Sequence, residues 1–169
     1  MRKLTIIFAL GLMVFSCKDK GSQGSANTEK VEIAFMKQGE LSFLNEGELL
    51  KKIEIEIADT KNKQARGLMD RSGMEENRGM LFIFDDNDIR RHTFYMKNTR
   101  FPLDIMYFDK DSVLINIARN AQPGADSKAN GGTVDGAASE SKFVVEINGG
   151  LADKWGVEEG VTKIYWTRD

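Results

Sequence analysis

Residues 53–58 read Ile53-Glu54-Ile55-Glu56-Ile57-Ala58, a regular alternation of apolar and charged side chains. Because successive side chains of a β-strand point to opposite faces of a sheet, this alternation predicts a strand with one buried and one wet face. A second stretch, Met80-Leu81-Phe82-Ile83-Phe84, is apolar throughout and predicts a strand that is buried on both faces. The two stretches together favour a domain built on a β-sheet.

Further candidate elements lie on both sides of these two strands. A helix is predicted over 60–69, capped by Asp59 or Thr60 and turning Ala65, Leu68 and Met69 inward, and a helical turn or two over 150–155. We also expect a hairpin within 31–44, with its turn at 37–40, and strands over 90–96, 103–108, 113–117, 143–147 and 161–166. The predicted fold is α+β and mostly β: a compact single domain, a sandwich or partly closed barrel of about eight short strands with two short helices.

The amino terminus has the pattern of an export signal. Arg2 and Lys3 precede an uncharged, almost wholly apolar run over residues 4–15. As a helix this run would cover roughly 18 Å, well short of the ~30 Å hydrocarbon core of a bilayer. Residues 1–16 are therefore predicted to be a signal peptide.

The residues that follow resemble the lipobox of bacterial lipoproteins. In such proteins a small residue, here Ser16, precedes the cysteine that receives lipid, here Cys17, the only cysteine in the chain. Two or more acyl chains give stable anchoring, so we expect attachment to a membrane through Cys17. The alternative is an ordinary secretory signal followed by an incidental cysteine.

The lipobox resemblance divides the chain into three parts. Residues 1–16 form the signal peptide, 17–30 the lipidated cysteine and a flexible tether rich in Gly, Ser and Lys, and 31–169 the globular domain. Phe15 and the charged residues after Cys17 resemble signals of Bacteroidetes lipoproteins. The expected location is the bacterial cell envelope, and both a periplasmic and a surface-exposed orientation remain open.

Composition excludes several classes of function. The formal net charge is −2, and loss of Arg2 and Lys3 with the signal peptide makes it −4, which argues against a nucleic-acid partner. With one cysteine and one histidine, His92, the chain has no means to form an intrachain disulfide, a cysteine-ligated zinc or a multi-histidine metal site. Methionines at apolar positions are read as core rather than copper ligands, and the acidic residues of 85–88 as a solvated turn rather than a calcium loop. No metal and no cofactor are expected.

Three blocks of sequence resemble one known family. They are Ala65-Arg66-Gly67-Leu68-Met69-Asp70-Arg71, Gly79-Met80-Leu81-Phe82-Ile83-Phe84, and the run from Phe94 to Ile105 that contains Met96-Lys97-Asn98-Thr99 and Pro102-Leu103-Asp104. In this order and spacing they resemble the family called domain of unknown function 192, over about residues 53–166. Tyr95 stands where the family usually has tryptophan, and Val161 where it usually has aspartate. The resemblance implies a compact, β-rich, often exported domain with no established activity.

The densest polar cluster surrounds the family's third block. In a purely structural role, Asn98 and Thr99 would satisfy backbone groups of a loop, and Asp104 would pair with Lys97 or Arg71. In a functional role, six side chains would converge on a small polar ligand such as a carboxylate, a sugar or a phosphate group. These ligand-binding candidates are Arg71, Lys97, Asn98, Thr99, Asp104 and Glu146.

Three functions are compatible with this pattern. The leading interpretation is a non-catalytic envelope lipoprotein that binds a small polar ligand or an envelope protein. The second is a hydrolase of cell-wall or polysaccharide material, in which Asp104 and Glu146 would act as a carboxyl pair held about 5 to 10 Å apart. The third is an assembly accessory without a ligand, recognisable by an exposed apolar patch.

Overall fold

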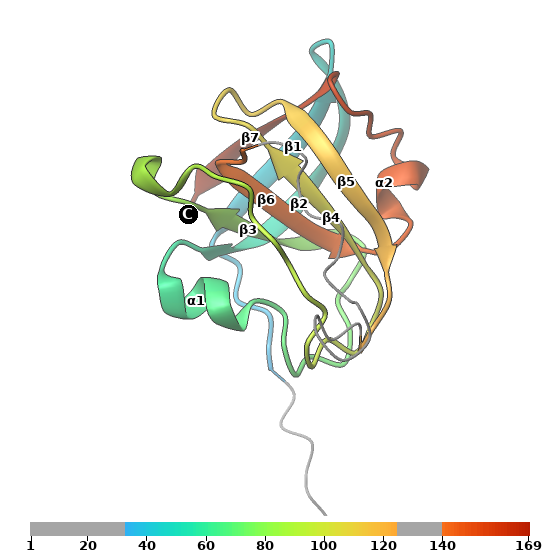
Figure 1. The fold of residues 1–169 in the computed structure, drawn as a ribbon. Helices are drawn as coiled ribbons and strands as arrows, with labels where there is room; N and C mark the ends of the chain where they lie inside the picture. Colours follow the sequence, from blue (N-terminus) through green and yellow to red (C-terminus); the bar gives the residue numbers. More distant parts are fainter. Residues whose placement is uncertain (1–32, 125–139) are drawn as a thin grey trace, which may run out of the picture. The chain divides into compact units, whose positions relative to one another are not determined.

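A computed structural model of the protein describes residues 33–124 and 140–169 (Figure 1). The predicted signal peptide, Cys17, the predicted tether and residues 125–139 lie outside the described residues. In chain order the elements are β1 (Gly39–Asn45), β2 (Glu48–Ala58), α1 (Lys61–Arg66), β3 (Arg78–Ile83), the 3-10 turn η1 (Asp86–Asp88), β4 (Leu103–Phe108), β5 (Leu114–Ala121), β6 (Phe143–Asn148), α2 (Leu151–Lys154) and β7 (Thr162–Arg168).

The strands form one hydrogen-bonded sheet of seven, in the order β5-β4-β6-β3-β2-β1-β7. Every neighbouring pair is antiparallel except β2 and β3, which run parallel and are connected through α1. The two outermost strands approach each other at one isolated bridge, Val113 with Lys163. The predicted mostly β single domain with two short helices is confirmed, as a single sheet that is not closed into a barrel.

Apolar side chains cover both faces of the central strands. One cluster includes Phe43, Ile55 and Ile147, and the other includes Phe82 and Tyr107, all nearly inaccessible to water. Strand β4 is buried along its whole length. Because β4, β6 and β3 lie at the centre of this double core, a side chain on either of their faces is removed from water, whether or not it is apolar.

The predicted amino-terminal hairpin is wrong in its position. Its turn was expected at 37–40, but β1 and β2 are joined by Glu46 and Gly47, which have φ angles of 48° and 91°. A two-residue turn with positive φ at both positions matches the right-handed twist of paired strands, and glycine adopts this conformation readily. The strand predicted at 53–58 therefore begins earlier, at Glu48.

The strand predicted over 90–96 is also wrong. The segment forms no strand, and within the described residues an isolated bridge joins Arg90 to Ser141. Its alternating side chains pack on the sheet instead: the ring of His92 stacks on that of Phe84 with centroids 3.4 Å apart, and Phe94 meets Phe82 edge-on at 5.0 Å. Residues 90–96 therefore alternate because every second side chain packs against the sheet face that the segment covers.

The first helix is shorter than predicted and differs in what it buries. Helix α1 covers Lys61–Arg66 with Thr60 as N-cap, whose hydroxyl accepts a hydrogen bond from the Lys63 amide. Ala65, expected to face inward, is exposed, whereas Leu68, in the turn after the helix, is 2% exposed. Helix α1 thus lies over one sheet face as a cover, and the chain after it inserts into the core.

Candidate functional site

Asp104, a predicted ligand-binding residue, is a structural carboxylate. It is 1% exposed, and its two oxygens accept hydrogen bonds of 2.8 Å from the backbone N–H groups of Asn120 in β5 and Ala152 in α2. The structural interpretation had expected Asp104 to pair with Lys97 or Arg71. Its partners are instead these two backbone amides. Both oxygens are therefore occupied in joining β4 to its neighbours, and the carboxylate is not available to a ligand.

Asp104 and Glu146 lie on opposite faces of the sheet. In the register of β4 and β6, Asp104 stands opposite Ile147, while Glu146 stands opposite Ile105. Residues directly opposite in an antiparallel pair share a face, and successive residues alternate, so the two carboxyl groups point away from each other. A pair that must flank one glycosidic bond does not arise from this arrangement, and the hydrolase built on Asp104 and Glu146 loses its geometric basis.

The Lys97–Thr99 turn divides between surface and interior. The side chains of Lys97 and Asn98 are exposed, and Asn98 has a φ of 54°, a left-handed conformation that asparagine tolerates. Its carbonyl accepts a hydrogen bond of 2.9 Å from the Asp70 amide. Thr99, in contrast, is buried at 7% exposure and lines a pocket. Of the three, only Thr99 contributes to the candidate site described below.

Arg71 forms a buried ion pair with a residue that the sequence did not single out. Its Nη1 lies 2.6 Å from Oε2 of Glu56, and each side chain is 9% exposed. Glu56 belongs to β2 and stands beside Met80 of β3, which in turn stands opposite Glu146 of β6. The three therefore form one row across a single sheet face, and Arg71 lies close enough to Glu146 to influence its charge.

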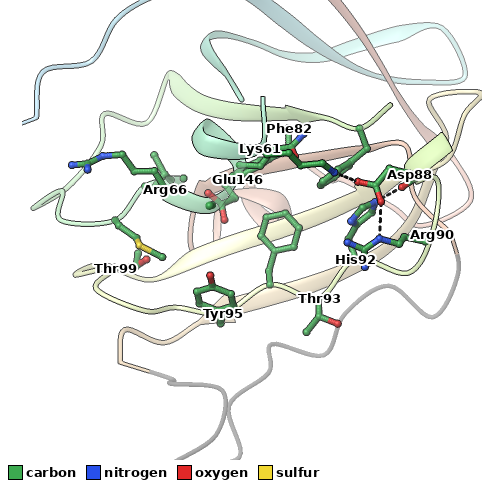
Figure 2. Close-up of a pocket in the computed structure, with 17 residues that line it drawn as sticks. Lys61, Arg66, Phe82, Asp88, Arg90, His92, Thr93, Tyr95, Thr99 and Glu146 are labelled. Atoms are coloured by element: carbon green, nitrogen blue, oxygen red, sulfur yellow. Dashed lines mark hydrogen bonds and ion pairs between the residues drawn. The ribbon is translucent and has the colours of Figure 1, made fainter. Parts of the chain in front are cut away.

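A pocket of about 220 Å³ lies on this same face, between α1 and the segment that covers the sheet. Aromatic rings form much of its wall, and Figure 2 shows the Glu146 carboxyl between helix α1 and Tyr95. The pocket is lined by Lys61, Gln64, Ala65, Arg66, Gly67, Leu68, Met69, Phe82, Phe84, Asp88, Arg90, His92, Thr93, Phe94, Tyr95, Thr99 and Glu146.

Glu146 is the unusual group in this pocket. It is 6% exposed, and within the described part of the chain its Oε2 has no hydrogen-bond partner. Burial raises the pKa of its carboxyl to about 8, and the nearby Arg71 guanidinium lowers it by less. At neutral pH the carboxyl is therefore mostly protonated and carries an O–H that can donate a hydrogen bond.

Glycine at position 67 keeps the space beside Glu146 open. Gly67 follows α1 with a φ of 48°, and a Cβ there would lie 3.3 Å from the Phe82 ring and 3.9 Å from Oε2 of Glu146. A larger residue would both strain the backbone and occupy volume next to the carboxyl. Arg66 and Gly67, which belong to the first of the three family blocks, thus form part of the pocket wall next to Glu146.

A second buried hydroxyl lies near the carboxyl. Tyr107 of β4 is fully buried, and its hydroxyl has no hydrogen-bond partner among the described residues. Burial raises the pKa of Tyr107, and the neighbouring Glu146 adds to this effect. The phenol therefore stays protonated at neutral pH, buried near Glu146 but not among the residues that line the pocket.

The far end of the pocket carries fixed charges. Asp88 is paired with Lys61 and, over 2.8 Å, with Nε of Arg90, and these two cations hold the pKa of Asp88 at about 2. Burial lowers the pKa of His92, with help from Arg90, so its ring is neutral at pH 7. Figure 2 shows this group of ion pairs beside His92, on the opposite side of the pocket from Arg66.

The sequence identified Glu146 and Thr99 but missed the aromatic wall. The available signal was the run Thr93-Phe94-Tyr95, which reads as a strand until the structure shows that it covers the sheet. Within residues 33–124 and 140–169, no three acidic, histidine or cysteine side chains are grouped so that they could hold a metal ion. Over the same ranges, no helix is long and apolar enough to cross a membrane.

Comparison with known proteins gives a family and two similar structures. A family model described as "Uncharacterized ACR" matches residues 42–164, which includes part of β1, not covered by the resemblance over 53–166. A protein of unknown function from Novosphingobium aromaticivorans DSM 12444 is 32% identical, with a TM-score of 0.64 over 75% of this chain and 84% of that one. A protein from Sinorhizobium meliloti 1021, described as a "putative transcription regulator", is 27% identical, with a TM-score of 0.67 over 80% of this chain and 97% of that one. Among proteins of curated function, none matches the sequence. Since the family model spans most of the chain, this protein belongs to the DUF192 family, as the three sequence blocks had indicated.

Proposed function

We propose that this protein is a lipid-anchored envelope protein whose domain binds a small ligand in the aromatic pocket through Glu146. The observation that carries the proposal is the Glu146 carboxyl, which is 94% buried, unpartnered at Oε2 and directed into a hollow. Buried polar groups almost always find hydrogen-bond partners, and an unsatisfied one costs about 1 to 3 kcal/mol. A ligand that hydrogen-bonds to this carboxyl would recover that energy.

The dimensions and walls of the pocket indicate the size of the ligand. An apolar cavity of ~150 Å³ accommodates benzene, so a hollow of about 220 Å³ has room for one ring and a short substituent. Phe82 and Phe94 offer ring edges and faces to such a body, and Tyr95, 42% exposed, stands at the mouth. Ligand sites commonly combine apolar walls with a few fixed polar groups, as this one does.

Benzamide is a suitable first probe, because it is one ring with an amide that hydrogen-bonds to a carboxyl. We expect it to raise the melting temperature of the purified protein at about pH 6.5 and to shift the NMR signals of Phe94, Tyr95, Thr99 and Glu146. Glu146→Leu should weaken this binding about tenfold, the equivalent of one lost hydrogen bond.

The Glu146→Leu variant is a fair test because it removes a buried acid and so should remain folded. Glu158→Gln, an exposed side chain outside the pocket, is the matched control and should bind benzamide as the parent does. Shifts that map elsewhere, or equal affinity in Glu146→Leu, would remove the basis of the proposed site.

The proposed anchor has its own test in the native host. Full-length protein should fractionate with membranes, and mass spectrometry of its mature amino terminus should find acyl chains on Cys17. Cys17→Ser should move the protein to the soluble fraction, because a single seryl hydroxyl does not enter the lipidation pathway and no acyl chains remain to hold it. Recovery of the parent protein with a free Cys17 thiol would contradict the anchor while leaving the pocket untouched.

A further inference from the structure

Two polar groups of the pocket can donate a hydrogen bond to a ligand. Protonated Glu146 presents an O–H beside an Oε2 that has no partner within the described residues, and Thr99, 7% exposed, lines the same pocket with its hydroxyl. Two other polar side chains of the wall are already engaged: Gln64 donates to the carbonyl of Ile83 over 2.8 Å, and Nε2 of His92 lies 2.9 Å from the carbonyl of Asp88. A ligand with hydrogen-bond acceptors can therefore use both O–H groups.

The charges around the pocket also favour a ligand that accepts hydrogen bonds and carries negative charge. Three cations line it, Lys61, Arg66 and Arg90, against the single carboxylate of Asp88, because Glu146 is mostly protonated. Lys61 and Arg90 are bound to Asp88, but the Arg66 guanidinium makes no hydrogen bond or ion pair within the part of the chain that the structure describes. In Figure 2 the Arg66 side chain extends from the end of α1 away from Glu146, and the residue is exposed at the edge of the pocket that it lines.

We infer that the pocket takes a small ring compound that carries a carboxylate, held by the O–H groups of Glu146 and Thr99 within the field of the surrounding cations. This inference rests on the proposed function and names the chemical class of its ligand. Hydrogen bonds to a charged acceptor are roughly twice as strong as those between neutral groups, which favours a carboxylate over an amide of the same shape. An ammonium group would meet donors and a net positive charge.

Three probes of nearly equal shape separate these classes: benzoate, benzamide and benzylamine. At about pH 6.5 the purified full-length protein should bind benzoate about tenfold more tightly than benzamide, and benzylamine not measurably. Arg66→Ala should weaken benzoate about threefold and leave benzamide unchanged, since the contribution of one exposed cation is small. Lys63→Ala, on the same helix but outside this pocket, is the control and should alter neither.

A pH series tests the hydrogen bond itself. Benzoate binding should fall as pH rises through about 8, where Glu146 loses its proton and two carboxylates would face each other. Arg71 and Glu56, the charged groups in the same row as Glu146, are held together in an ion pair. Burial raises the pKa of Tyr107 and lowers the pKa of His92, which moves both groups away from this window. Glu146→Gln, which keeps an N–H donor without an acid, should bind benzoate at pH 9 as it does at pH 6.5.

The outcomes distinguish the inference from the proposed function. Equal affinity for benzoate and benzamide, or tighter binding of benzylamine, would overturn the ligand class while leaving a small-molecule site in place. Failure of all three probes to bind would overturn the proposed function and, with it, the ligand class.

Discussion

Replacing Glu146 with glutamine is expected to raise the free energy of unfolding at about pH 8 by several kcal/mol, and to leave it nearly unchanged near pH 4. The carboxyl has a pKa of about 8 in the folded protein, because burial disfavours its charged form, against an ordinary value of 4.5 for a glutamate in water. One unit of pKa corresponds to about 1.4 kcal/mol, so the difference sets an upper range of roughly 5 kcal/mol.

The sign follows from which state binds the proton more tightly. Between about pH 4.5 and 8 the folded protein keeps the proton of Glu146 while the unfolded chain has lost it. The stability of the parent protein should therefore fall as pH rises through this window and level off above about pH 8. Glutamine has the same shape without the acid, so the difference between variant and parent should grow over the same window.

Urea unfolding of both proteins at several pH values measures this difference. Glu158→Gln, in an exposed position, should change the free energy of unfolding by less than about 0.5 kcal/mol at each pH. A Glu146→Gln variant that is equally or less stable than the parent at pH 8 would show that the carboxylate is satisfied in the folded protein. In that case the argument for a vacant hydrogen-bonding group would be lost.

The strands that could be predicted from sequence are those whose pattern reflects local burial. The alternation of 53–58 and the apolar run of 80–84 fall in β2 and β3, because side-chain direction and burial leave a direct record in the order of residues. The same alternation at 90–96 misled, because a segment lying on a sheet face also turns every second side chain inward. An alternating pattern therefore indicates which side of a segment is buried. It does not indicate whether the backbone of that segment forms the hydrogen bonds of a β-sheet.

The candidate site was harder to predict because partners and faces are set by register. Glu146 and Asp104 are both acids in buried strands, and nothing in their neighbourhoods along the chain tells one from the other. The two acids differ in their hydrogen-bond partners. Backbone amides 16 and 48 residues away along the chain donate to both oxygens of Asp104. Oε2 of Glu146 has no hydrogen-bond partner among the described residues. Pairing of β4 with β6 then fixes the two acids on opposite faces.

The Asp104→Ala variant should lose about 3 to 5 kcal/mol of the free energy of unfolding. The substitution removes the acceptor of two charge-assisted hydrogen bonds, each worth about 1.5 to 3 kcal/mol, and leaves the amides of Asn120 and Ala152 without it. Asp104→Asn, which retains one acceptor oxygen but presents an N–H₂ group to the second amide, should lose about half as much. Urea unfolding at neutral pH measures all of these differences.

Asp153→Ala is the matched control for this prediction, since Asp153 lies in α2, is exposed and, among residues 33–124 and 140–169, pairs with the exposed Arg119 over 2.5 Å. Its loss should be below about 1 kcal/mol, as for other solvated ion pairs. Benzoate affinity adds a second measurement, because Asp104 lies on the face opposite the pocket and its loss should leave the affinity of the folded fraction unchanged. A stable Asp104→Ala protein that no longer binds benzoate would instead make Asp104 a ligand-binding residue, as the sequence first suggested, and would place the working surface on the other face of the sheet.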